Sequence, residues 1–539
     1  MSDHQDSRNQ GRIPFRLRVG VTGHRRLTDE EALANQARRA LHRIRELVPS
    51  SPHTPVLFTV ISPLAEGADR LVAREVLEDE DADLEVPLPS PQQEYLRDFE
   101  TEASKSEFQG LLSRAELVTQ LPPSRSSEEA YESVGRYVVD CCDVLIALWD
   151  GKPSCGQGAT ATIVHYARDR GVPLIWINTE GSHESVEMLG NGINAGPFGQ
   201  LDEYNRAKIA QEHFAQQVDQ HRSQLLDVAR QRDTWAPPLQ VISEWVSAFY
   251  VRADLLAMRY QNWYYVLGNA LFLLAAAAVA AVASQVAFAP ETPELVLIEV
   301  GLMVGVLLIV VIGRLWHFHD RWISYRFLAE RFRSAFFLAL AGLGGYREAS
   351  LEQVYLGHPS EEWLRRAFGE VWSQRPQVDL ADSSVEDVRR FLVEAWIEDQ
   401  SRFHRSAQRK YKARHLRLSL ATTILFGATL AAAALHASGL AEHESAGPLS
   451  WADLLVVLAI SMPALGAAVS GIRAEREYLG NSERYDQMAR HLEGARERML
   501  GARDIETVGI VAAEAENLML EENRDWFIVM RPHEVRPPW

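Results

Sequence analysis

Four long apolar stretches constrain the fold of this 539-residue chain more than any other feature of its sequence. Two contain no ionisable residue, one contains a single acid, Glu299, and one a single histidine, His436. The stretches are Val266–Phe288, Leu295–Gly313, Leu418–Leu440 and Leu454–Ile472. A helix of about 20 apolar residues crosses the ~30 Å hydrocarbon layer of a bilayer and satisfies its own backbone hydrogen bonds there. We therefore predict four transmembrane helices in two hairpins, with buried core helices as the alternative.

Basic residues avoid the loops inside the two predicted hairpins. No Lys or Arg occurs in residues 261–313 or 418–472, and both hairpin loops contain glutamates. Basic residues cluster at the outer ends of the stretches: Arg252, Arg259, Arg314, Arg321, Arg326, Arg402, Arg405, Arg409, Lys410, Lys412, Arg414, Arg417, Arg473 and Arg476. Positively charged flanks stay in the cytoplasm. We therefore expect a multi-pass protein of the inner (cytoplasmic) membrane, with both termini and residues 314–417 in the cytosol.

Similar short motifs flank the two hairpins. Arg259-Tyr260 precedes the first stretch and Lys410-Tyr411 the third, while Tyr325–Arg331 follows the second and Tyr485–His491 the fourth. These matches predict an internal repeat. The expected organisation is an α/β domain over residues 1–180, a helical connector over 181–250, a first transmembrane hairpin with a cytosolic helix over 251–345, a cytosolic helical insertion over 346–400, and a second hairpin with a cytosolic helix and tail over 401–539.

Short apolar runs alternate with amphipathic stretches in residues 14–179. The runs predict strands at Phe15–Val21, Val56–Ile61, Leu84–Leu88, Ala115–Leu121, Val144–Trp149 and Pro173–Asn178. After the first run, Thr28 is the expected N-cap of a helix that ends near Leu47. This alternation predicts a doubly wound, mostly parallel, Rossmann-like sheet with helices on both faces. The expected fold class is thus an α/β domain followed by an all-α region with four transmembrane helices.

Small and polar residues follow three of the predicted strands. Doubly wound sheets bind ligands at the carboxyl ends of their strands, and a glycine-containing loop before a helix N-terminus suits a phosphate. The expected ligand-binding residues are Thr22, Gly23, His24, Arg25, Ser62, Glu66, Gly67, Asp69, Asp150, Gly151, Gly156, Gly158 and Thr160. The alternative for each loop is an ordinary tight turn. No catalytic residue and no metal site is expected.

The charge of the chain narrows the class of partner. A net charge of −18 argues against a nucleic-acid groove, because phosphate contacts need clustered Lys and Arg. The expected partners are the lipid bilayer, a nucleotide or nucleotide-derived messenger, and further copies of the chain in a homo-oligomer. Within the second stretch, Glu299 is a candidate functional acid or a solvated interfacial one. Gly301 and Gly305 have the spacing of closely packed membrane helices.

Three loops of the α/β part carry a family resemblance. Residues 19–25 (VGVTGHR), residues 64–69 (LAEGAD), and the Trp149-Asp150-Gly151 and 156–160 segments resemble the SLOG superfamily, a Rossmann-like group that includes DprA and the LOG nucleotide-processing proteins. Arg259-Tyr260 and residues 328–331 (LAER) resemble the SLATT group of two-helix membrane effectors. The pairing implies a nucleotide sensor joined to an effector that perturbs the membrane, typical of bacterial antiviral defence.

One position departs from the enzymatic members of the SLOG group. They place a glutamate three residues after the threonine of their glycine-rich motif, and counting from Thr160 that position is Ile163. An apolar side chain cannot transfer protons, which favours binding over hydrolysis. Two alternatives stay open: a membrane-tethered nucleotide N-glycosidase or phosphoribohydrolase that uses Glu66 or Asp69, and a ligand-gated ion channel similar to the melastatin-type TRP channels.

Overall fold

The computed structural model describes most of the chain as two compact units. The described residues are 10–152, 160–180, 186–189, 192–229, 236–292, 294, 296–341, 362–376, 378, 384–438 and 450–530. One unit comprises Met1–Ser7, Arg12–Lys208 and Gly357–Val371, and the other comprises Arg8–Gly11, Ile209–Leu356 and Trp372–Trp539. We call the first the α/β unit and the second the helical unit.

A seven-stranded sheet with the order β4-β3-β2-β1-β5-β6-β7 forms the centre of the α/β unit. Its strands are β1 (Phe15–Gly23), β2 (Val56–Ile61), β3 (Asp83–Leu88), β4 (Leu117–Gln120), β5 (Val144–Trp149), β6 (Leu174–Asn178) and β7 (Val186–Leu189). The first six are parallel, and β7 pairs antiparallel with β6. The predicted Rossmann-like sheet is confirmed. The sequence did not predict β7, which lies in the stretch interpreted as a connector.

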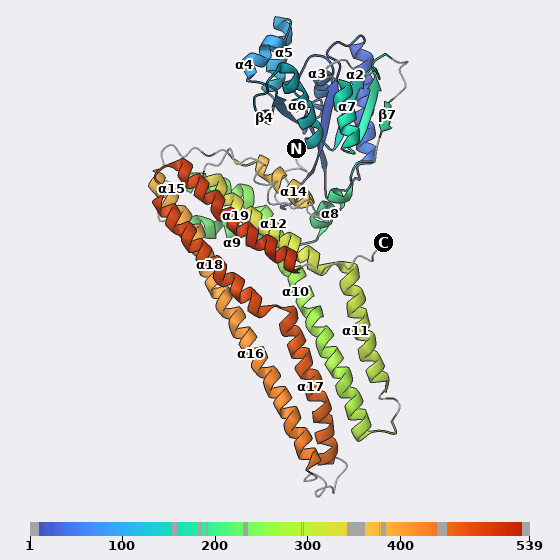
Figure 1. Cartoon of the computed structure of the whole chain (residues 1–539), viewed down its shortest axis with the longest axis vertical. Coiled ribbons are helices and arrows are strands. Elements are labelled where there is room, and N and C mark those ends of the chain that lie inside the picture. The colour runs from blue at the N-terminus through green and yellow to red at the C-terminus, as the bar shows by residue number, and fades with distance from the viewer. Residues whose placement is uncertain are drawn as a thin grey trace. The chain divides into compact units, whose positions relative to one another are not determined.

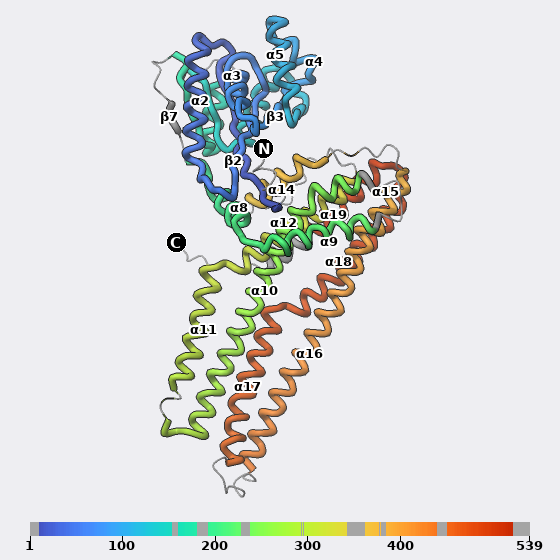
Figure 2. The backbone as a smooth tube through the Cα atoms, turned by 180° about the vertical axis from the view of Figure 1, so that it is seen from behind, coloured from blue at the N-terminus to red at the C-terminus, as the bar shows by residue number. Residues whose placement is uncertain are grey.

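Helices cover both faces of this sheet. Figure 1 shows α6 (Ser127–Cys141) and α7 (Thr160–Asp169) in front of it, and Figure 2 shows α2 (Glu30–Leu47) and α3 (Ala68–Val76) on the opposite face. The α/β unit also contains α4 (Gln92–Tyr95), the 3-10 turn η1 (Leu96–Asp98), α5 (Glu102–Leu112), α8 (Gly196–Arg206) and most of α14 (Glu362–Ser373). The N-cap of α2 is Asp29, whose side chain accepts from the Ala32 N–H, so the prediction of Thr28 was wrong by one residue.

The centre of the sheet is apolar throughout. Every residue of β5 is buried, because the strand has helices on both faces and neighbours on both sides. Leu145 and Trp149 pack in one cluster with Val138 of α6 and Ile163 of α7. Since such a core leaves no apolar surface for a ligand within the sheet, the polar residues at the strand ends become the candidates for function.

The helical unit contains the predicted spans. Its elements are α9 (Gln211–Ala229), α10 (Ala236–Phe288), α11 (Val296–Trp316), α12 (Phe318–Leu340), α15 (Val385–Phe391), the π-helical turn η4 (Leu392–Ile397), α16 (Glu398–Ala437), α17 (Trp451–Glu475), α18 (Tyr478–Gly501) and α19 (Ile505–Met530). Among the described residues, four helices are long and apolar enough to cross a membrane, and they overlap the four predicted stretches. The chain is therefore a multi-pass membrane protein with an α/β domain. Figures 1 and 2 show α11, α10, α17 and α16 side by side in this order.

The two hairpins end in the same way. His317 separates α11 from α12 and Glu477 separates α17 from α18, and both have a left-handed backbone, with φ of 44° and 45°. In each half, the tyrosine before the first span packs against a tyrosine of the helix that follows the second span. The two pairs are Tyr260–Tyr325, with ring centroids 5.5 Å apart, and Tyr411–Tyr485, with centroids 5.3 Å apart. These equivalent contacts support the internal repeat predicted from the same tyrosines.

Candidate functional site

The strand order of the sheet reverses between β1 and β5, the position at which doubly wound folds bind ligands. His24 follows β1 and Asp150 follows β5. The Asp150 N–H donates to His24 Nε2 over 3.1 Å, and the same nitrogen lies 3.2 Å from Asp150 Oδ1. Although desolvation opposes it, the Lys152 N–H and His24 hold the pKa of Asp150 below its usual value. The structure therefore brings these two predicted site residues into direct contact.

The loops after β1 and β2 are packed backbone against backbone. Gly67 has a φ of +80°, and a Cβ there would lie 2.4 Å from the carbonyl oxygen of Arg25 and 2.5 Å from that of His24. The N–H of Ala68 donates to the His24 carbonyl over 3.1 Å. Only glycine fits this combination of backbone conformation and space. Gly67 thus fixes the position of His24 and Arg25 relative to α3.

Replacing Gly67 with alanine is expected to lower the free energy of unfolding of the α/β unit by about 2–4 kcal/mol, from the unfavourable backbone conformation and the clash together. The matched control is Gly110→Ala in α5, because a Cβ at Gly110 meets no atom within 4 Å. The control should stabilise the unit by about 0.5–1 kcal/mol. Amide hydrogen exchange of β1 and α3 in the full-length protein measures both effects. Equal exchange in the two variants would contradict the argument.

Asp69 is a buried carboxyl group at the start of α3. It is only 6% exposed, and its Oδ2 accepts a hydrogen bond of 3.3 Å from the Ala65 N–H. Burial raises the pKa of Asp69 to about 7, against the opposing effects of the Ala65 N–H, Arg25 and Arg70. Asp69 is therefore a carboxyl group poised to change charge near neutral pH. Ser62 is also fully buried, but its hydroxyl binds backbone groups of Leu64 and Asp69 and so holds the loop together.

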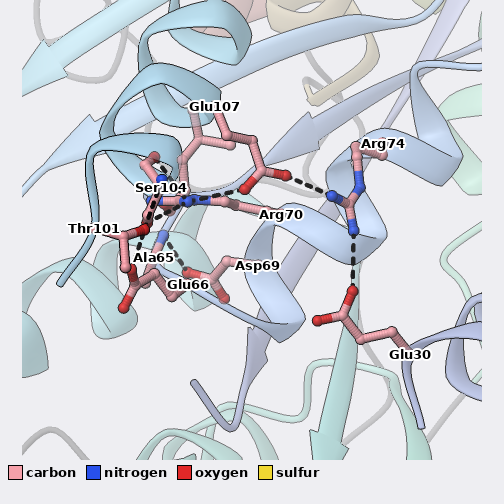
Figure 3. A network of polar contacts seen from close by, with 10 residues as sticks. Glu30, Ala65, Glu66, Asp69, Arg70, Arg74, Thr101, Ser104 and Glu107 are labelled. Atoms are coloured by element: carbon pink, nitrogen blue, oxygen red, sulfur yellow. Dashed lines mark hydrogen bonds and ion pairs between the residues drawn. The ribbon is translucent and has the colours of Figure 1, made fainter. Parts of the chain in front are cut away.

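Arg70, the next residue of α3, is the centre of the polar network drawn in Figure 3. Its side chain is buried and donates from Nε to the Leu64 carbonyl over 3.0 Å. Its Nη1 donates to the Ser104 hydroxyl over 2.8 Å and to Glu107 over 3.0 Å. The guanidinium carbon lies 4.6 Å from the centre of the Phe99 ring. The other terminal nitrogen, Nη2, is buried and has no hydrogen-bond partner among the described residues.

Tyr95 adds a second buried donor without a partner. Its side chain is fully buried between Phe99 and Phe108, and its hydroxyl has no hydrogen-bond partner in the described part of the chain. Burial and the nearby Asp69 carboxylate raise the pKa of Tyr95 well above its usual value. Tyr95 follows β3 as Asp69 follows β2 and Arg25 follows β1. Three adjacent strand ends thus contribute to one polar cluster, which we define as Arg25, Asp69, Arg70 and Tyr95.

Glu66 borders this cluster, and its member Arg25 also contacts α6. Glu66 accepts a hydrogen bond from the Ser104 hydroxyl, as Figure 3 shows, so its carboxylate is held by α5. The Arg25 guanidinium carbon lies 4.7 Å from the centre of the Tyr131 ring on α6. The sequence analysis missed Arg70, Tyr95, Ser104 and Tyr131. The position of Tyr95 in the segment that follows the strand ending at Leu88 was the one available signal, since the carboxyl ends of parallel strands share an edge.

The third predicted loop is described only at its two ends. Gly156 and Gly158 lie outside the described residues, and Thr160 is the first residue of α7. Gly151 has a φ of +82°, and a Cβ there would lie 3.2 Å from the Trp176 ring. Ile163 is buried. A Cβ at Gly135 of α6 would lie only 2.5 Å from its side chain, so the two helices pack closely at this point. Ile163 is thus part of the apolar core.

The predicted membrane residues lie on α11. Glu299 is half-buried near the start of the helix. A Cβ at Gly305 would make ordinary contact with Leu274 of α10 at 3.6 Å, and a Cβ at Gly301 would meet no atom within 4 Å. A tighter contact lies at Gly471 of α17, where a Cβ would lie 2.5 Å from the Phe272 ring of α10. Within one chain, Gly301 and Gly305 therefore do not bring two helices into close contact.

Comparisons with known proteins add no family to this geometry. No protein-family model matches the chain, and no curated protein matches its sequence. Among the described residues, no group of three or more His, Cys, Asp or Glu side chains is arranged to hold a metal ion. The arguments about function therefore rest on the polar cluster and on the four apolar helices.

Proposed function

We propose that this chain is a membrane-bound sensor and effector. Its α/β unit faces the cytosol and binds a nucleotide-derived ligand at the carboxyl edge of the sheet, between the ends of β1, β2, β3 and β5. Its four spans respond by forming a pore or by disrupting the inner membrane. The basic flanks of the spans support the orientation, because both termini and residues 314–417 then lie in the cytosol.

The observation that carries this proposal is the set of buried donors without partners. The Tyr95 hydroxyl and Arg70 Nη2 have no hydrogen-bond partner among the described residues, and both lie beside the buried Asp69 carboxyl. A buried polar group without a partner costs about 1–3 kcal/mol. Native proteins keep few such groups, and a bound ligand is one explanation for those that remain. The cluster lies at the edge of the sheet where this fold class binds ligands.

The chemistry of the cluster favours an anionic ligand with hydroxyl groups. Arg25 and Arg70 supply two guanidinium groups, which bind phosphate with strong charge-assisted hydrogen bonds. The N-terminus of α3, which begins at Ala68, adds partial positive charge. The Asp69 carboxyl accepts hydrogen bonds of the kind that ribose hydroxyls donate. These features together fit a nucleotide, and the buried Ile163 favours binding over hydrolysis.

The resemblance to the SLOG and SLATT groups supports the same assignment. In that interpretation the α/β unit is the SLOG-like sensor and the two hairpins are the SLATT-like effector. A role in bacterial antiphage defence follows from the resemblance alone. The equivalent tyrosine pairs of the two hairpins support a duplicated two-helix effector. Homo-oligomerisation of the chain is part of the proposal.

The Tyr95→Phe variant tests the site with the smallest possible change. The Tyr95 hydroxyl has no hydrogen-bond partner among the described residues, so removing it should not destabilise the ligand-free protein. A nucleotide that uses this hydroxyl should raise the melting temperature of the unmodified protein and lose most of that effect in the variant. At a concentration of about 100 Kd, binding stabilises by about 2.7 kcal/mol. The measurement is a thermal-shift screen of the full-length protein in detergent against mono-, di- and cyclic nucleotides and NAD.

The control is Tyr166→Phe on α7, which removes an exposed hydroxyl that is hydrogen-bonded to Asp140. The control should keep every ligand response. The proposal is wrong if no nucleotide stabilises the unmodified protein, or if Tyr95→Phe responds as the control does.

A further inference from the structure

The amino edge of the sheet, opposite the proposed ligand edge, is occupied by a helix from far along the chain. This helix, α14, belongs to the segment that joins the two transmembrane hairpins, yet its residues up to Val371 are part of the α/β unit. The sequence analysis interpreted residues 346–400 as an insertion and contained no signal for this packing. A helix of 12 residues is only marginally stable by itself in water. Its order therefore depends on what it packs against.

Two ion pairs of opposite direction hold α14 on the sheet. Arg366 donates to both carboxylate oxygens of Asp143, which directly precedes β5, with a distance of 2.8 Å from Nη1 to Oδ2. One turn later, Glu370 accepts two hydrogen bonds from Arg16 of β1, at 2.5 Å from Nε and 2.9 Å from Nη2. Bidentate pairs of this kind fix orientation as well as contributing energy. The cation Arg366 of α14 thus meets the anion Asp143 before β5. Four residues later, the anion Glu370 meets the cation Arg16 of β1.

Apolar contacts complete the surface. Trp363 is 3% exposed, and its ring lies 6.0 Å from that of Tyr204 on α8. Leu364, Ala367 and Phe368 are buried as well. Glu370 has a side chain only 4% exposed. Separating the buried Glu370 carboxylate from the Arg16 guanidinium is costly, because their mutual attraction offsets the desolvation of both charges. Arg16 also pairs with Asp83, and Arg366 also pairs with Glu362 of its own helix.

The two strands that hold α14 also carry the proposed ligand edge. β1 has Arg16 near its amino end and leads into His24 and Arg25, while β5 is preceded by Asp143 and followed by Asp150. Eight residues of extended strand separate Arg16 from His24, about 26 Å. The boundary between the two units falls inside α14, after Val371, and the ring of the next residue, Trp372, lies 6.1 Å from Trp245 of α10.

We infer that the amino edge of the sheet is a docking surface for the chain's own α14, and that release of α14 from it activates the membrane hairpins. Docked α14 holds the segment between the two hairpins on the α/β unit. The trigger, binding of a nucleotide at the far ends of β1 and β5, rests on the proposed function. The docking surface and the effect of releasing α14 do not.

Arg366→Ala tests the inference, and Arg365→Ala is the matched control. Arg365 neighbours Arg366 on α14. Its ion pair with Glu362 of the same helix is a long one of 4.0 Å, and among the described residues it makes no ion pair with the sheet. In full-length protein in vesicles of phosphatidylethanolamine and phosphatidylglycerol, Arg366→Ala should accelerate amide exchange of α14 roughly tenfold. It should also release a trapped dye without any nucleotide, and Arg365→Ala should do neither.

A second variant, Glu370→Gln, keeps the test valid if Arg366→Ala misfolds. Glu370→Gln breaks the other ion pair with almost no change in volume, and exchange of the β5 amides in the same samples reports whether the sheet is intact. The inference is overturned if α14 keeps its protection in both variants, or if α14 is freed and the dye stays trapped. Dye release by Arg366→Ala in a protein that no nucleotide stabilises would overturn the proposed ligand and leave the docking inference standing. If a nucleotide binds, and both variants release α14 without release of the dye, the docking inference is overturned and the proposed ligand stands.

Discussion

Asp69→Asn is expected to stabilise the α/β unit at pH 8 and to remove the stabilisation by the nucleotide that we propose as its ligand. The folded-state pKa of Asp69 is about 7, above its ordinary value of 3.8, because burial disfavours the charged form. Folding therefore favours the protonated carboxyl group. At pH 8 the group is ionised in both states, and the folded state bears the full cost of a buried charge. Each pKa unit corresponds to about 1.4 kcal/mol, so the cost reaches about 4 kcal/mol at most.

The sign of the pH dependence follows from the same values. Between pH 4 and pH 7 the folded state binds more protons at Asp69 than the unfolded state does, so the contribution of this group to stability falls as pH rises. Below pH 4 both states are protonated and the contribution is fully present. The advantage of Asp69→Asn should thus be large at pH 8 and small at pH 4.5. Amide exchange of β2 and α3 in the full-length protein measures it across this range.

Asp150→Asn is the matched control, because it replaces a carboxylate of the same edge whose pKa is lowered instead. Its contribution has the opposite sign: folding favours the ionised form, so Asp150→Asn should not stabilise the protein at pH 8. If the two variants respond alike, the burial of Asp69 is not the cause. A gain in stability that accompanies a loss of ligand response is typical of a binding site, where strained groups are kept for function.

The fold was predictable where one physical signal dominates. The run of β5 is apolar at every position because the strand is buried on both faces, and the four spans are apolar because lipid surrounds them. Both signals are local in sequence. β7 escaped prediction because a four-residue edge strand has neither the length nor the alternation that would distinguish it from a loop.

The candidate site was predictable only in its loops. Gly67 and Asp69 follow β2 in a pattern that the sequence displays, whereas Arg70 looks like any basic residue on an amphipathic helix. Its burial depends on Ser104 and Glu107, more than 30 residues away. The pairing of Arg366 with Asp143 spans 223 residues, and no local pattern reports a contact of that kind. Side chains that acquire their role from distant partners need the structure.

Glu516→Gln is expected to destabilise the helical unit strongly. Glu516 of α19 accepts a hydrogen bond of 2.8 Å from Arg331 of α12, and the side chains of the two residues are 0% and 1% exposed. Replacing the carboxylate with an amide removes the negative charge of this buried ion pair and keeps the positive charge of Arg331. Breaking a buried ion pair from one side costs about 3–5 kcal/mol. Amide exchange of α12 and α19 in detergent measures the loss.

Two further variants distinguish the effect of the buried charge from the effect of packing around α19. Glu514→Gln, two residues earlier on α19, breaks a half-exposed pair with Arg498 at 3.3 Å and should change stability by less than about 1 kcal/mol. The double variant Arg331→Met with Glu516→Leu removes both charges and should recover much of the loss, because an apolar pair of similar volume replaces a buried ion pair at little cost. If the double variant is as unstable as Glu516→Gln, packing around α19 and not the loss of the Glu516 charge determines the effect. Since α12 directly follows the first hairpin, this pair joins α19 to the helix that continues from the inner end of that hairpin.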